Sequence, residues 1–161
     1  MFENREGQRV PQVTFRARNE SDWKPITTDD VFKGKTVVVF SLPGAFTPTC
    51  SAKHLPGFIE KNAELRGRGV VKIACLSVND AFVMSAWGKD QKADGKVQML
   101  ADGNGDFTRA VGLEMDGTGY GMGKRSQRYA MVVDNGVVKT LNVEKPGSFE
   151  VSSADAVLKA L

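Results

Sequence analysis

The stretch TVVVFSLPGAFTPTC, residues 36–50, decides the fold because it joins a buried strand to the start of a helix. Residues 36–40 are apolar, mostly β-branched and free of charge, which is typical of a strand at the centre of a sheet. Residues 50–65 then alternate apolar and charged side chains at helical spacing, which predicts an amphipathic helix. Cys50 therefore falls in the first turn of a helix, at the carboxyl end of a buried strand.

This position of Cys50 favours a reactive thiol. Free backbone N–H groups and the helix dipole stabilise negative charge in a first helical turn, and the thiolate is the nucleophilic form of cysteine. An unpaired cysteine is more often a small buried hydrophobic residue, so the residues around Cys50 must indicate whether its thiol is reactive. Thr47 brings a hydroxyl three residues before the sulfur, Pro43 and Pro48 stiffen the loop, and Gly44 permits backbone geometry that other residues resist.

Residues 43–51, together with 54–58, resemble the active-site segment of the peroxiredoxins. They are most similar to the peroxiredoxin 5 branch, which includes the plant type II enzymes and the bacterial peroxiredoxin–glutaredoxin hybrids. The likeness extends to residues 78–84 and 128–133 and covers nearly the whole chain. The resemblance implies a thioredoxin-like fold, thiol peroxidase activity and a catalytic set formed by Thr47, Cys50 and Arg128, with Pro43 shielding the site.

The implied reaction is attack of the Cys50 thiolate on one oxygen of a peroxide. Arg128 can stabilise the negative charge that moves onto the leaving oxygen, because a guanidinium is permanently charged and offers several donors in one plane. By itself the sequence would favour a surface salt bridge for Arg128. His54, the only histidine, lies four residues after Cys50 on the same helix face. We expect it to support the site together with Gly44 and Phe46, since a catalytic base usually comes from elsewhere in the chain.

The role of Cys75 decides which thiol regenerates Cys50, and the sequence allows two answers. A sulfenic acid on Cys50 must be resolved by a second thiol before it oxidises further. Some animal relatives use a cysteine near the C-terminus, but residues 151–153 contain none. Plant type II and hybrid enzymes have a cysteine where Cys75 stands, in an apolar strand where an inert buried thiol is equally expected. If Cys75 is inert, glutathione or a glutaredoxin attacks the sulfenic acid directly.

We expect one α/β domain over residues 1–161, with a thioredoxin-like central mixed sheet flanked by helices and ending in a β-hairpin and a helix. The glycine-rich residues 117–124 do not fit a phosphate-binding loop and are interpreted as a mobile loop. The sequence predicts strands over residues 10–16 (an edge strand), 36–40, 70–78 and 97–100, and a β-hairpin over 129–141 that turns at Asn135-Gly136. It predicts a helical turn over 27–32, a helix over 50–65 that bends at Pro56, and a helix over 107–113. Two further helices begin after capping residues at 79–80 and 153–155.

Composition excludes several classes. A net charge of +3 is too small to indicate nucleic-acid binding, and the basic groups at 66–68 and 124–125 are interpreted as solvated turns. No apolar run approaches a membrane span and no N-terminal signal region is visible. Two cysteines and one histidine lack any zinc spacing, so we expect no metal and no cofactor. Two cysteines do not form a secreted disulfide scaffold, which favours the cytoplasm.

The sequence thus predicts a cytoplasmic thiol peroxidase for hydrogen peroxide and alkyl hydroperoxides, recycled by glutathione with glutaredoxin or by thioredoxin. A redox relay that passes oxidation from Cys50 to a partner protein would use the same residues, and a cysteine hydrolase is a distant third. The resemblance also implies a homodimer with Phe46 and Phe82 near its interface. Residues 1–7 resemble the hybrid enzymes, in which a glutaredoxin domain follows. We therefore expect either a separate reductant or a longer parent protein.

Overall fold

The computed structural model describes residues 5–18 and 22–161, so the likeness of residues 1–7 to the hybrid enzymes lies partly outside the described residues. The strands are β1 (Thr14–Arg18), β2 (Trp23–Thr27), β3 (Thr36–Ser41), β4 (Lys72–Ser77), β5 (Gln98–Ala101), β6 (Glu114–Asp116), β7 (Lys124–Ser126), β8 (Tyr129–Asp134) and β9 (Val137–Val143). The helices are α1 (Thr28–Phe32), α2 (Leu55–Glu60), α3 (Asn62–Gly67), α4 (Ala81–Asp90), α5 (Asp106–Ala110) and α6 (Ala154–Ala160), with a π-helical turn η1 (Cys50–His54) and a 3-10 turn η2 (Thr118–Tyr120).

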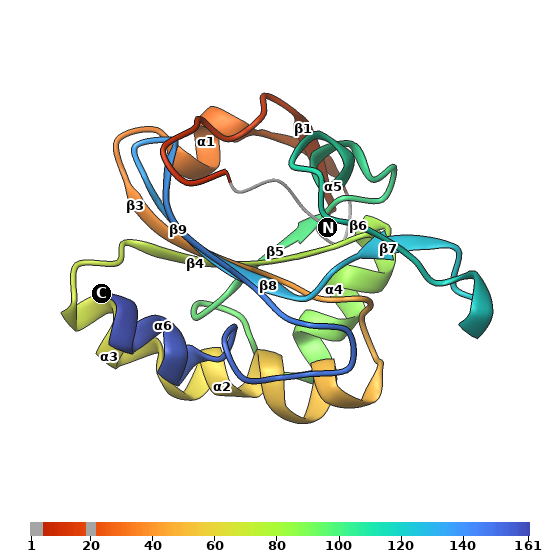
Figure 1. The fold of residues 1–161 in the computed structure, drawn as a ribbon. Helices are drawn as coiled ribbons and strands as arrows, with labels where there is room; N and C mark the ends of the chain where they lie inside the picture. The colour runs from red at the N-terminus through yellow and green to blue at the C-terminus, as the bar shows by residue number, and fades with distance from the viewer. Residues whose placement is uncertain (1–4, 19–21) are drawn as a thin grey trace.

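The central strand is β3, as the sequence predicts. The main sheet has the order β2-β1-β5-β4-β3-β8-β9, and β3 pairs parallel with β4 and antiparallel with β8. Its apolar side chains alternate between two hydrophobic clusters, one on each face of the sheet. Helices α2, α3, α4 and α6 cover one face, and α1 and α5 cover the other (Figure 1). The predicted thioredoxin-like mixed sheet flanked by helices is confirmed.

The helices and the hairpin begin or turn where the capping and turn residues of the sequence predict. Thr27 makes a capping box at the start of α1, Asp80 accepts a hydrogen bond from the Val83 N–H at 2.8 Å, and Ser153 caps α6. The β8–β9 hairpin turns at Asn135 and Gly136, whose φ values of 48° and 80° are those of a type I′ turn. Each of these signals acts within a few residues, which explains why the sequence reveals them.

The N-terminal strand lies later and deeper than the sequence predicts. The pattern indicates an edge strand over residues 10–16, whereas β1 starts at Thr14 and lies between β2 and β5. The edge is β2, which carries Pro25 where a missing backbone donor is tolerated. Residues before β1 run to the opposite side of the sheet, where the Val10 N–H donates to the Gly136 carbonyl at 2.9 Å.

Two further segments differ in detail from the prediction. The helix expected over residues 50–65 is divided into η1, α2 and α3, and the change of helical pattern occurs beside Pro56. The glycine-rich stretch 117–124 connects β6 to β7 in a two-stranded ribbon that the sequence pattern does not predict, and its expected mobility stays a prediction. This ribbon projects from the main sheet (Figure 1). Its closing contact is a hydrogen bond from the Gly117 N–H to the Gly123 carbonyl.

Candidate active site

Cys50 is the first residue of η1 and is fully buried. The closing hydrogen bond of this turn runs from the Leu55 N–H to the Cys50 carbonyl, one residue wider than in an α-helix. Pro56 accounts for the change, since proline has no N–H with which to continue the α-helical pattern. Single π-helical turns are frequent at functional sites, and here the turn carries the predicted nucleophile.

Arg128 contacts the sulfur of Cys50 directly. β8 pairs with β3 so that Tyr129 lies opposite Ser41, which brings the residue before β8 beside the loop that leads to Cys50. One guanidinium nitrogen of Arg128 donates to the Cys50 Sγ at 3.2 Å. A hydrogen bond from a charged donor is shorter and stronger than one between neutral groups. This contact joins two residues that are 78 positions apart in the chain.

His54 is held between Arg128 and the backbone. Its Nδ1 lies 2.9 Å from a second guanidinium nitrogen, and its Nε2 lies 3.0 Å from the Ser152 carbonyl oxygen. Because arginine can only donate, Nδ1 is the acceptor and Nε2 carries the hydrogen that Ser152 accepts. Burial, and then the charge of Arg128, lower the pKa of His54 to about 3. The ring is therefore neutral, and its lone pair is already used by Arg128.

Glu144 organises the loop that closes the site, and nothing in the sequence pattern pointed to it. Its carboxylate accepts backbone hydrogen bonds from Glu150, Val151 and Ser152, and it also accepts the Ser152 hydroxyl at 2.7 Å. Burial alone would raise the pKa of this carboxyl, but the hydrogen bonds outweigh it and hold the pKa below its usual value. The same loop places the Phe149 ring 5.8 Å from the guanidinium carbon of Arg128.

The loop before Cys50 is fixed by main-chain contacts. The Thr47 hydroxyl donates to the Gly44 carbonyl at 2.6 Å, and the Ala45 N–H donates to the Asn79 side chain at 2.9 Å. A Cβ on Gly44 would lie 2.9 Å from a guanidinium nitrogen of Arg125, so no larger residue fits there without movement. Pro43 lies in the same loop and offers its carbonyl to Arg125 at 3.4 Å.

The basic groups at residues 66–68 and 124–125 are interpreted from the sequence as solvated turns, and this interpretation is wrong. Arg125 lies in β7 and bridges the Met122 and Pro43 carbonyls, which ties the ribbon to the loop before Cys50. Arg66 lies in α3 and donates to the Val71 carbonyl at 2.7 Å. Composition alone missed both contacts because their acceptors are backbone carbonyls, which every sequence has.

Two phenylalanines with exposed side chains are Phe46, in the loop before Cys50, and Phe82, in α4. Phe46, at 53% exposure, has a φ of 62°, which is strained for a residue with a side chain. Phe82 in α4 is also 53% exposed and packs edge-on against Trp23 with ring centroids 5.2 Å apart. The family resemblance pointed to the two phenylalanines, whereas Trp23 lies in β2, a strand that the sequence pattern does not predict.

Cys75 is buried in β4 opposite Phe40. Burial raises the pKa of its thiol well above the usual value, and the neighbouring Cys50 adds to this effect, while Arg128 opposes it. Both cysteines are free thiols. A neutral thiol inside the sheet is a poor nucleophile.

Among residues 5–18 and 22–161, no group of three or more His, Cys, Asp or Glu side chains is arranged to hold a metal ion. Within this part of the chain, none of the helices is long and apolar enough to cross a membrane.

The chain matches the redoxin family over residues 5–158. Peroxiredoxin-2E, chloroplastic, from Arabidopsis thaliana is 50% identical over 96% of this chain and 68% of its own length. The hybrid peroxiredoxin hyPrx5 from Haemophilus influenzae is 50% identical over 97% of this chain and 66% of its own length, so the chain spans about two thirds of either relative. The crystal structure of reduced Prx3 from Vibrio vulnificus in complex with hydrogen peroxide has 53% identity and a TM-score of 0.92, covering 96% of this chain and 97% of that one.

The thioredoxin-like sheet and the match over residues 5–158 place the chain in the redoxin class. Within that class the chain belongs to the peroxiredoxin family, with relatives among the plant type II and hybrid enzymes. Its activity is that of a thiol-dependent peroxidase.

Proposed function

We propose that this protein reduces hydrogen peroxide and small alkyl hydroperoxides, with Cys50 as the attacking thiolate and Thr47, Arg128 and Pro43 around it. The observation that carries the proposal is the 3.2 Å hydrogen bond from Arg128 to the Cys50 sulfur. A fixed cationic donor beside the sulfur is also beside any oxygen atom that the sulfur attacks. It therefore stabilises charge as the charge moves from sulfur to oxygen.

The first step forms a sulfenic acid. The Cys50 thiolate attacks one oxygen of ROOH, an S–O bond forms and the O–O bond breaks. Sulfur loses two electrons, which leave with the other oxygen as RO⁻. That oxygen takes a proton from solvent and departs as an alcohol, or as water when the substrate is hydrogen peroxide. Cys50 remains as Cys–SOH.

Thr47 and Pro43 support this step in different ways. The hydrogen of the Thr47 hydroxyl is donated to the Gly44 carbonyl, so its oxygen keeps lone pairs that can accept the O–H of a hydroperoxide. Pro43 has no backbone donor and its carbonyl is held by Arg125. The proline ring therefore covers the site without offering a competing hydrogen bond.

An external thiol completes the cycle in this proposal. A thiol RSH attacks Cys–SOH to give a mixed disulfide and water, and a second thiol then releases reduced Cys50 and RSSR. The burial and neutral state of Cys75 support this route over resolution by Cys75. The relative named as a hybrid peroxiredoxin favours glutathione with a glutaredoxin as the reductant. Thioredoxin is the alternative.

Assembly and location are part of the same proposal. We propose one domain across the chain, a homodimer that covers Phe46 and Phe82, and a cytoplasmic location. The half-exposed aromatic side chains support an interface, since large apolar groups gain most from burial. Two free thiols support a reducing compartment.

The test begins with the reduced protein and one equivalent of hydrogen peroxide in the absence of other thiols. Intact mass should show the gain of one oxygen atom, and Cys50→Ser should show none. Glutathione with glutaredoxin should then sustain many turnovers for each protein molecule. A single oxidation with no turnover by either glutaredoxin or thioredoxin would favour the redox relay instead.

A further inference from the structure

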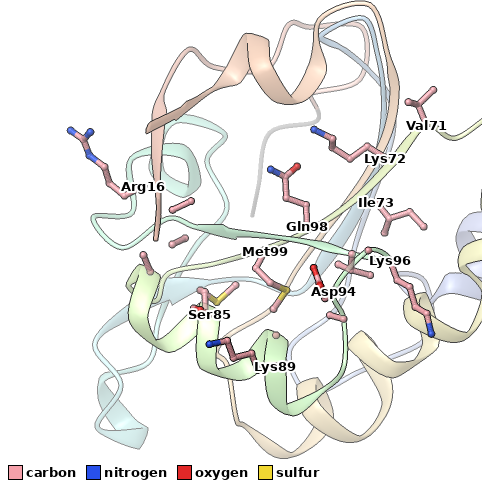
Figure 2. A pocket seen from close by; sticks show the side chains of 18 of the residues that line it. Arg16, Val71, Lys72, Ile73, Ser85, Lys89, Asp94, Lys96, Gln98 and Met99 are labelled. Atoms are coloured by element: carbon pink, nitrogen blue, oxygen red, sulfur yellow. The ribbon is translucent and has the colours of Figure 1, made fainter. Parts of the chain in front are cut away.

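A cavity of about 690 Å³ opens where α4, β1, β4 and β5 meet (Figure 2). This volume is typical of sites for small ligands. Part of its lining is apolar and comes from Ile73, Met84, Val97 and Met99. None of the described residues that line it belongs to the Cys50 site, so the peroxidase reaction leaves the cavity unexplained.

The cavity lies beside a part of β5 with which no strand of the described residues is paired. Within residues 5–18 and 22–161, β1 pairs with β5 at one position, Arg16 opposite Ala101. The Asp102 N–H donates to the Ser77 carbonyl on the β4 side. Because backbone groups alternate along a strand, the N–H groups of Ala101 and Met99 point away from β4. On that side of β5, no strand among the described residues is paired with Met99, which lines the cavity.

Gln98 adds a buried polar atom to the cavity. Its Oε1 has no hydrogen-bond partner among the residues that the structure describes. A buried polar atom without a partner is destabilising, so a ligand that supplies one gains affinity. The terminal amide can also rotate to present its nitrogen instead, which lets it accept from an N–H or donate to a carboxylate.

The charges around the cavity are mostly positive. Among the described residues, the basic side chains of Arg16, Arg66, Lys72, Lys89 and Lys96 line it, against one acidic side chain, that of Asp94. Figure 2 shows Lys72 and Gln98 on one side of the sheet, with Met99 and Lys89 on the other. Burial, and then the nearby charge of Lys35, lower the pKa of Lys72, which indicates that an anion beside it would be favourable.

We propose that this cavity binds a short acidic peptide in an extended conformation, paired with the free edge of β5. The unpaired main chain of Met99 would bond to the peptide backbone, as in other cases of strand addition. Alternate side chains of the peptide would point to opposite faces of the sheet. Acidic side chains would meet Lys72 and Gln98, and apolar ones would pack on Met99 and Met84.

The experiment titrates ¹⁵N-labelled full-length protein with the peptide acetyl-Glu-Val-Glu-Val-Glu-amide, up to about 1 mM. The Met99 amide resonance should shift, and the shift should weaken as salt is added. The peptide acetyl-Lys-Val-Lys-Val-Lys-amide should leave it unchanged. Absence of binding, or binding that leaves Met99 unaffected, would overturn the proposal. An equal response to citrate alone would also overturn it, because the cavity would then be a site for small anions.

Matched variants separate the cavity from general charge. Lys72→Gln with Lys96→Gln should weaken binding of the acidic peptide about tenfold. Lys139→Gln, which removes one exposed charge from the distant strand β9, should leave it unchanged. Peroxidase turnover should stay the same in all variants, which shows that each is folded. Equal loss of affinity in the Lys139 variant would contradict the proposed site.

Discussion

Arg128 donates a hydrogen bond to the Nδ1 of His54 at 2.9 Å while another of its nitrogens donates to the Cys50 sulfur at 3.2 Å. The planar guanidinium is thus fixed at two points. His54 is itself anchored through the Ser152 carbonyl. The direction in which the cation faces the sulfur is therefore set by a chain of hydrogen bonds and not by Cys50 alone.

Replacing Arg128 by lysine tests the need for this geometry. Arg128→Lys keeps the positive charge but cannot reach His54 and Cys50 together, because an ammonium is not a planar fork. We expect kcat/KM for hydrogen peroxide to fall about a hundredfold or more, in line with the loss of one fixed donor. Stopped-flow oxidation of Cys50 measures it. Arg109→Lys, a change at an exposed helix position, should leave the rate unchanged, and equal rates for both variants would contradict the role of Arg128.

His54 should make the protein less stable in acid. Its ordinary pKa of 6.5 applies in the unfolded chain, whereas burial and then Arg128 hold it at about 3 in the folded protein. Between these values the unfolded state binds one more proton, so the free energy of unfolding falls as pH falls. The slope is at most about 1.4 kcal/mol per pH unit. Urea unfolding at several pH values measures it.

The matched control is His54→Asn, which removes the only histidine. In this variant the slope between pH 6.5 and pH 5 should largely disappear, since carboxyl groups titrate mainly at lower pH. The variant should also oxidise more slowly, because Arg128 loses an acceptor. An unchanged slope would mean that the ring is protonated in the folded protein, contrary to the described hydrogen bonds.

Glu144 is expected to act as a positioning residue. Glu144→Gln keeps the shape of the side chain but removes the charge and replaces an acceptor by a donor facing backbone N–H groups. We expect a loss of stability of about 1–3 kcal/mol and a slower reaction of Cys50, since the loop carries both Phe149 and Ser152. Glu150→Gln removes the same charge from an exposed side chain of the same loop. Equal rates in the two variants would restrict Glu144 to a purely structural role.

Cys75→Ala should preserve the reaction cycle. If an external thiol resolves Cys50, turnover with glutathione and glutaredoxin should match that of the unmodified protein. A small loss of stability, on the order of 1 kcal/mol, is expected from the cavity left in the core. Intact mass after peroxide provides the second measurement. A disulfide between Cys50 and Cys75 in the unmodified protein would refute external resolution and require local unfolding around β4.

The proposed dimer depends on Phe82 and its contact with Trp23. Phe82→Asp places a charge on this surface, so sedimentation velocity should show a shift from dimer to monomer. Tyr120→Asp is the matched control, because Tyr120 is 85% exposed at the tip of the β6–β7 ribbon and should leave the assembly unchanged. A monomer in the unmodified protein would contradict the proposal directly.

Elements with strong local signals could be predicted from the sequence. The apolar run of β3, the cap at Asp80 and the Asn135-Gly136 turn act over a few residues, and each forms as expected. The strand β2 and the ribbon β6–β7 were missed. Their residues are polar or glycine-rich, and they become strands only because a partner strand lies alongside them.

The candidate site likewise has features that the sequence predicts and features that only the folded chain shows. The sequence by itself determined that Cys50 begins a helix after a buried strand, and the motif around it carried the family resemblance. Only the tertiary structure decided that Arg128 reaches the sulfur, that His54 is neutral, and that Glu144 fixes the loop beside them. These contacts join residues far apart in the chain, and several end on backbone groups that every sequence contains. Such contacts follow from strand register and burial, which are properties of the folded chain and not of any one segment.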